Sequence, residues 1–198
     1  MACCVDFHFD FSSPYGFLAA MKIERTLPRG RYRQLAWRPF LLGAVYQRFG
    51  QSPLEHPLKG RYVLEIDAPR VGRRDGLMLK VPAGFPQHSL PGARAFYWIE
   101  ARAPEKAADF AKAAYRKYWI DGHSTADPDI AIDAAAMMGF DRKRVAEGLQ
   151  DPTVKLRLVT ENEQAIANGV FGSPFIRIDG APFWGSGRLD DVAERLAA

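Results

Sequence analysis

The chain has 198 residues, 47% of them hydrophobic and 25% charged, which is typical of a soluble globular protein with one substantial core. No apolar run approaches the length needed to cross a bilayer, and the opening residues MACCVDFHFD show no secretory signal. The net charge of +4 is modest and no nucleic-acid recognition motif is present, so we expect a cytoplasmic protein that binds neither membranes nor nucleic acid.

The N-terminal part of the chain combines strand and helix signals. Residues 3–9, CCVDFHF, alternate in polarity and predict a strand. Ser13 followed by Pro14 is typical of a helix N-cap with proline in the first turn, and apolar residues recur after it at helical spacing. A second strand is predicted over residues 31–37, RYRQLAW.

The middle of the chain, from about residue 39 to residue 150, has a helical pattern interrupted by Pro and Gly. The clearest helical segments are residues 93–102, 104–120 and 127–138. The proline-rich stretch over residues 80–92, KVPAGFPQHSLPG, predicts a loop.

The C-terminal part returns to mixed signals. Asp151 and Pro152 open a helix that is predicted to run to about residue 168. Residues 175–184, FIRIDGAPFW, predict two short strands around an Asp-Gly turn, and residues 188–198 predict a closing helix. This order gives an α/β chain with a thioredoxin-like layout and an inserted helical block, although periodicity alone does not name the fold. We expect residues 1–40 and 151–198 to form a thioredoxin-like domain and residues 41–150 an inserted helical domain.

Charge and metal-ligating residues limit the functional classes. Residues 22–74 contain twelve Lys or Arg and four Asp or Glu, which indicates either a solvated basic face or a surface that attracts small carboxylates. The adjacent Cys3 and Cys4 point to opposite faces of a strand and are expected to stay reduced. The four histidines have no metal-ligand spacing, so no metal site is expected.

Four segments in this order carry a family resemblance: DFSSPYGFL, WRPFLLG, GVFGSPFIRIDG and FWGSGRLDD. Together with the block over residues 59–70, they resemble the 2-hydroxychromene-2-carboxylate isomerase and kappa-class glutathione transferase family, a DsbA-like branch of the thioredoxin fold. The resemblance covers nearly the whole chain. It implies an α/β, thioredoxin-like fold with a large all-helical insertion, and glutathione as the cofactor.

The resemblance gives Ser13 a catalytic role. Disulfide oxidoreductases of this fold carry Cys-x-x-Cys at the start of the first helix, whereas this chain reads Ser13-Pro14-Tyr15-Gly16 and has no sulfur there. The resemblance implies that Ser13 contacts the sulfur of glutathione, where a hydroxyl donor and a helix end stabilise a thiolate. A plain N-cap is the alternative, and the two roles are compatible; Ser12 is the less favoured candidate.

Other cofactor contacts also follow from the resemblance. It implies that Pro174 is cis and that the backbone of Ser173 pairs with the peptide backbone of glutathione. Lys59 matches a lysine that reaches a glutathione carboxylate, and Gln51 stands where relatives carry an asparagine near the ligand. Taken alone, either residue fits an ordinary surface position.

The closing motif departs from the family pattern. Gly187 stands where the family carries an aspartate that holds the γ-glutamyl amino group, while Ser186 and the amides of the last helix remain as donors. Asp190 or another chain is the alternative source of an acidic partner. The loss of one charged hydrogen bond costs about 1.5–3 kcal/mol, so this position predicts weaker glutathione binding or a different thiol ligand.

For the second substrate, the resemblance implies a small aromatic carboxylate held by Trp37, Arg38 and Tyr62, with a core role as the alternative for Trp37. Asp67 with Arg70 fits either the family pattern or an i,i+3 helix pair.

The implied activity is glutathione-dependent cis–trans isomerisation by thiolate addition and elimination. The alternatives are conjugation of electrophiles and non-catalytic binding of a thiol ligand. Disulfide exchange is disfavoured by the missing cysteines, and relatives suggest a homodimer.

Overall fold

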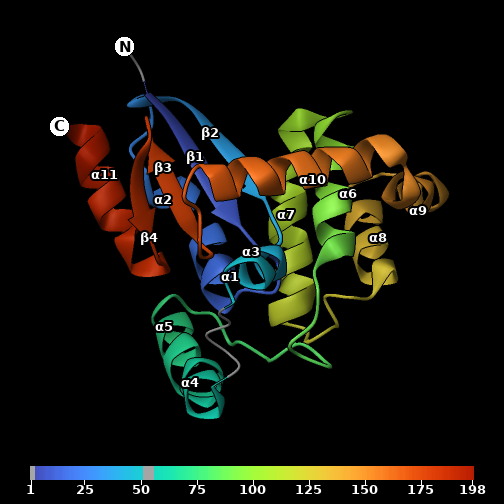
Figure 1. Cartoon of the computed structure of the whole chain (residues 1–198), viewed down its shortest axis with the longest axis horizontal. Helices are drawn as coiled ribbons and strands as arrows, with labels where there is room; N and C mark the ends of the chain where they lie inside the picture. Colours follow the sequence, from blue (N-terminus) through green and yellow to red (C-terminus); the bar gives the residue numbers. More distant parts are fainter. Residues whose placement is uncertain (1–2, 51–55) are drawn as a thin grey trace.

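The computed structural model describes residues 3–50 and 56–198, and their centre is a mixed four-stranded sheet (Figure 1). The strand order is β2-β1-β3-β4, in which β1 runs parallel to β2 and antiparallel to β3. Strands β3 and β4 form an antiparallel hairpin, so the two ends of the chain meet in one sheet. The strands are β1 (Cys3–Phe9), β2 (Tyr32–Pro39), β3 (Phe175–Ile178) and β4 (Ala181–Trp184).

Helices cover both faces of this sheet. On one face α1 packs against α7, and α11 packs against α2. On the other face α10 lies across the sheet, where its Glu161 pairs with Arg38 of β2 (Figure 1). The helices that contact the sheet or flank it are α1 (Pro14–Ala20), α2 (Ile23–Thr26), α3 (Leu42–Phe49), α10 (Pro152–Ala167) and α11 (Leu189–Ala197).

Residues 57–150 form two groups of helices. Four of them pack together beside the sheet: α6 (Leu90–Glu100), α7 (Pro104–Trp119), α8 (Pro128–Ala136) and α9 (Arg142–Gln150). The others extend away from the body as an arm, which consists of α4 (Pro57–Arg61), the π-helix η1 (Tyr62–Asp67) and α5 (Ala68–Arg74) (Figure 1). We call residues 57–74 the arm.

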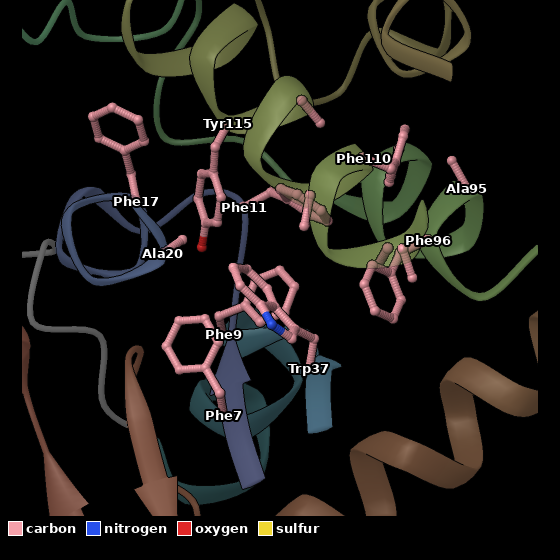
Figure 2. Packing of buried hydrophobic residues seen from close by; sticks show 14 of the residues in the cluster. Phe7, Phe9, Phe11, Phe17, Ala20, Trp37, Ala95, Phe96, Phe110 and Tyr115 are labelled. Carbon is pink, nitrogen blue, oxygen red and sulfur yellow. The ribbon is translucent and has the colours of Figure 1, made fainter. Parts of the chain in front are cut away.

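Aromatic side chains connect the sheet to the helical bundle. Phe9 of β1 packs edge-on against Trp37 of β2 and Phe96 of α6, at ring centroid distances of 5.5 and 5.9 Å (Figure 2). Phe11 packs against Tyr115 of α7 at 4.9 Å. Both parts of the chain contribute to one apolar core, whose burial is the main source of stability. The division into residues 1–40 with 151–198 and residues 41–150 stays a prediction.

Helix caps explain where several of these elements begin. The side chains of Ser13, Asp127, Asp141 and Asp151 each accept a backbone N–H in the first turn of the following helix.

The predicted α/β, thioredoxin-like element order with its helical insertion is confirmed. The predicted loop over residues 80–92 ends earlier than expected, because α6 already begins at Leu90 and tolerates Pro91 in its first turn. Across the described ranges, no helix is long and apolar enough to span a membrane.

Candidate functional site

A cleft of about 1980 Å³ opens beside the start of α1. Its walls are formed by α3, by the arm, by residues 85–90 before α6, and by the segments before β3 and after β4. Several residues predicted from the sequence line it together: Ser13, Lys59, Ser173, Ser186 and Gly187. Gln51 lies outside the described residues.

Ser13 is buried at the start of α1, with its hydroxyl in the middle of a short chain of hydrogen bonds. Its Oγ accepts the Gly16 N–H at 3.0 Å and donates to the carbonyl oxygen of Ser173 at 2.8 Å. The N-cap interpretation of Ser13 is therefore confirmed, as is proline in the first turn. Its contact with a glutathione sulfur stays a prediction.

Ser173 joins this arrangement from a distant part of the sequence. The peptide bond between Ser173 and Pro174 is cis, as the resemblance implies. The Oγ of Ser173 accepts the N–H of Asp10 at 2.8 Å. A Cβ on Gly16 would lie only 2.6 Å from that Oγ, so glycine at this position allows α1 and the Ser173 segment to approach closely.

Asp10 is a central residue of the site to which the sequence analysis gave no role. It is 2% exposed, and its Oδ1 accepts bonds from the N–H and Oγ of Ser12, both at 2.8 Å, and from the Oγ of Ser89 at 2.5 Å. Its Oδ2 accepts the N–H of Leu42 at 2.6 Å. The Asp-x-Ser pattern of an Asx turn was the available sequence signal, but it reveals nothing about Ser89 or Leu42.

Tyr15 and Asp67 connect α1 to the arm. The hydroxyl of Tyr15 donates to Asp67 Oδ2 at 2.6 Å, and burial together with this carboxylate raises the pKa of Tyr15. The phenol is therefore neutral near pH 7. Tyr62 donates to the other oxygen of Asp67 at 3.5 Å, and Arg70 lies 3.9 Å from it as the predicted i,i+3 pair. Tyr62 itself is exposed beside the cleft wall and does not line the cleft.

The structure does not bring Trp37 and Arg38 to the cleft. Neighbouring strand residues point to opposite faces. Trp37 therefore packs in the core against Phe7, while the Nε of Arg38 lies 2.6 Å from Asp6 Oδ1 on the α10 side. The substrate-binding role expected for these two residues has no support in their positions. The core alternative for Trp37 matches its burial.

The cleft combines apolar walls with charged side chains of both signs. The rings of Phe171 and Trp184 meet edge-on at 4.9 Å, and both are at least half exposed. Lys22 is paired with Asp75 at 3.4 Å, whereas Lys59 is exposed and forms no ion pair with any described residue. The exposed rings and the ammonium group of Lys59 suit a ligand with apolar groups and a carboxylate.

Gly187 leaves open space at the edge of the cleft. A Cβ built on it meets no atom within 4 Å, and its backbone is not in the left-handed region. In residues 3–50 and 56–198, no three His, Cys, Asp or Glu side chains are grouped closely enough to hold a metal ion.

Comparisons with known proteins give consistent results. The family model of the DSBA-like thioredoxin domain matches residues 4–197. A protein from Sphingobium xenophagum named 2-hydroxychromene-2-carboxylate isomerase is 29% identical over 195 residues, which cover 97% of both chains. A protein of the same name from Pseudomonas putida is 25% identical over 187 residues, covering 93% of this chain and 90% of its own.

Solved structures show the same fold. A structure of 2-hydroxychromene-2-carboxylate isomerase superimposes with a TM-score of 0.86 at 24% identity and covers 98% of this chain and 94% of its own. A cytosolic disulfide reductase, DsbM from Pseudomonas aeruginosa with GSH, superimposes with a TM-score of 0.61 at 14% identity, covering 98% and 95%.

Proposed function

Because the chain belongs to the family of DSBA-like thioredoxin domains, we propose that it binds glutathione beside α1 and isomerises 2-hydroxychromene-2-carboxylate or a similar aromatic carboxylate. The observation that carries this proposal is the position of Ser13. Its hydroxyl occupies the cleft, where redox members of the fold have a cysteine, and it lies beside Ser173 and the cis Pro174. The named relatives, which match over nearly their whole length, supply the substrate class.

The residues around the cleft fit the chemistry of glutathione. A tripeptide needs backbone partners, cations for its carboxylates and a donor for its sulfur. Ser173 offers its backbone, Lys59 offers an exposed ammonium group, and Ser13 offers a hydroxyl donor. When bound, glutathione would supply a sulfur nucleophile that adds to an electron-poor double bond, so that the ring C–O bond could open, the bond made single by the addition could rotate, and loss of the thiolate would restore the double bond in the other geometry.

The protein's own residues prepare this step. The Ser13 hydroxyl, which donates to the Ser173 carbonyl oxygen, would supply the hydrogen bond that stabilises negative charge on the sulfur. The phenol of Tyr15 presents no charge to the substrate, because burial and the hydrogen bond that it donates to Asp67 keep it protonated. The exposed rings of Phe171 and Trp184 provide an apolar wall for an aromatic substrate. The chain cannot exchange disulfides at this place, because residues 13–16 contain no cysteine.

The test is product analysis with the purified protein and 2-hydroxychromene-2-carboxylate, with and without glutathione. We expect the ring-opened isomer, trans-2-hydroxybenzylidenepyruvate, to form only with glutathione, while the total thiol concentration stays constant. Conversion that is equally fast without glutathione, or no conversion, contradicts the proposal. A steady loss of thiol identifies the kappa-like alternative, in which a stable conjugate forms.

Binding without turnover is the second candidate, and Gly187 favours it because the expected acidic partner of the γ-glutamyl ammonium is missing. Calorimetry that detects glutathione binding by a protein inactive in both assays supports this candidate.

We also propose that the chain is a cytoplasmic homodimer, as the resemblance implies. Light scattering of the purified protein tests the dimer, and a monomer at micromolar concentration contradicts it.

A further inference from the structure

Asp10 is a buried carboxylate that the proposed chemistry leaves without a role. Its hydrogen-bond donors come from the starts of three helices. Ser12 precedes α1, Leu42 is the first residue of α3, and Ser89 occupies the N-cap position of α6. The chain thus brings the starts of α3 and α6 to one carboxylate beside α1.

Hydrogen bonds from these donors, and not a paired cation, stabilise the negative charge of Asp10. The N-terminus of a helix carries partial positive charge, and hydroxyl and amide donors add to it. Among the described residues, no Lys, Arg or His forms an ion pair with Asp10. The carboxylate therefore remains the local negative charge at the place where these helix starts meet.

The backbone of Asp10 connects this charge to the site. Its carbonyl oxygen accepts the Ser13 N–H at 2.9 Å and the Tyr115 hydroxyl at 2.8 Å. Its N–H donates to Ser173 Oγ at 2.8 Å. The same residue therefore positions Ser13 and Ser173, the two residues proposed to meet glutathione.

We propose that Asp10 is a positioning residue that offsets part of the positive potential of the converging helix starts, and so limits how strongly the site stabilises a thiolate at Ser13. This inference rests on the proposed function. An attacking thiol works best when its pKa is near the ambient pH, because excessive stabilisation of the anion weakens it as a nucleophile. Asp10 has the charge and the position to prevent that.

Other titratable groups also face this region. Tyr46 of α3 lines the cleft, and burial together with the charge of Asp10 raises its pKa to about 12. Burial and Asp10 also raise the pKa of Tyr115 from α7. Tyr15 from α1 and His88 from the loop before α6 line the same cleft.

Five charged side chains line other parts of the cleft: Lys22, Lys59, Asp67, Arg74 and Asp75. These five side chains, and the tyrosines and histidine named above, are not substituted in the variants below. Differences between those proteins therefore report Asp10 and its donors.

The test follows the ultraviolet absorbance of the glutathione thiolate against pH, in complexes with the wild type and with Asp10→Asn. Removing a negative charge near the sulfur favours the thiolate, so we expect the titration midpoint to move to lower pH by about one unit. A midpoint that is unchanged or higher in Asp10→Asn overturns the inference. A wild type that shows no bound thiolate overturns the proposed function as well, so the two failures are distinguishable.

A second variant keeps the Asp10 carboxylate and removes two of the hydrogen bonds that stabilise it. Ser12→Ala combined with Ser89→Ala deletes two hydroxyl donors to Asp10 Oδ1 while the carboxylate remains. We expect this variant to move the midpoint to higher pH, opposite to Asp10→Asn. A purely structural role for Asp10 predicts the same direction in both variants. The double variant also decides the question if Asp10→Asn does not fold, since a midpoint that falls or stays unchanged overturns the inference.

Discussion

The hydroxyl of Ser13 has two partners in the folded chain, the Gly16 N–H and the Ser173 carbonyl oxygen. It can cap α1 with its lone pair and still turn its proton toward a ligand, because the two functions use different parts of the group. The cap and the proposed contact with sulfur are therefore separable by mutation, since glycine is nearly as good an N-cap as serine whereas alanine is not.

We predict that Ser13→Ala and Ser13→Gly lose activity to the same extent, about 10- to 100-fold in kcat/KM, because both lack the donor to the thiolate. Thermal unfolding should differ, with Ser13→Ala less stable by about 1 kcal/mol and Ser13→Gly by a few tenths. Steady-state kinetics and calorimetry measure the two effects. If Ser13→Gly keeps wild-type activity, Ser13 is a cap and no more.

Gly187 is the second residue at which a single side chain is informative. A Cβ added at this position meets no atom within 4 Å, so the side chain of an aspartate can start there without displacing a neighbour. We predict that Gly187→Asp lowers the dissociation constant of glutathione by at least about tenfold, because a carboxylate there pairs with the γ-glutamyl ammonium.

The matched control for this prediction is Gly187→Asn, which has the same shape without the charge. Calorimetric titration of the two variants and the wild type compares them directly. Equal affinities for Gly187→Asp and Gly187→Asn would mean that the ammonium group does not lie beside residue 187.

At the scale of elements, the arm is attached to α1 through Asp67. This carboxylate accepts from Tyr15 of α1 at 2.6 Å, and it ends the π-helix η1, a type of helix often found at functional sites. The arm contributes several cleft residues, among them Lys59, Val63 and Val71. Its placement therefore determines the shape of the cleft.

We predict that Tyr15→Phe accelerates amide hydrogen exchange in the arm, residues 57–74, and leaves the exchange of β1 unchanged. The substitution removes the 2.6 Å bond to Asp67 and leaves an otherwise similar ring in the cleft wall. Tyr62→Phe is the matched control, because its bond to Asp67 is much longer at 3.5 Å and the change should have little effect. Equal exchange rates in all three proteins contradict the prediction.

An element could be predicted from the sequence where a local signal, such as a helix cap, marks its start. Helices that open with Ser or Asp before proline, such as α1, α8 and α10, were predictable because the cap and the proline act locally. The π-helix η1 was not predictable, since no local propensity distinguishes it from an α-helix.

At the scale of the whole molecule, the buried His8 of β1 makes the stability of the fold depend on pH. It is 4% exposed on β1, and neither ring nitrogen has a hydrogen-bond partner among the described residues. Burial lowers its pKa from 6.5 to about 4, against an opposing effect of the Asp6 carboxylate. The folded protein therefore holds His8 neutral where the unfolded chain would protonate it.

We predict that the free energy of unfolding falls as the pH drops from 6.5 to 4. In this range the unfolded chain binds a proton at His8, whereas the folded chain keeps His8 mostly neutral. The contribution is about 3 kcal/mol by pH 4. His8→Leu removes it, so its stability should fall less than that of the wild type in this window. Urea unfolding at several pH values measures the difference, with the exposed His123→Leu as the control. Parallel curves for the wild type and His8→Leu contradict the prediction.

The sequence by itself determined the strands, the capped helices, the α/β class and the family, together with residues such as Ser13, Lys59 and Ser173 that line one cleft. Those features depend on local propensity or on motifs that can be read along the chain. Only the tertiary structure assigned Trp37 to the core, placed Arg38 under α10 and gathered the donors of Ser12, Leu42 and Ser89 on Asp10. The direction of a strand side chain and the convergence of helix starts depend on how distant segments pack, and the sequence around each residue does not record that packing.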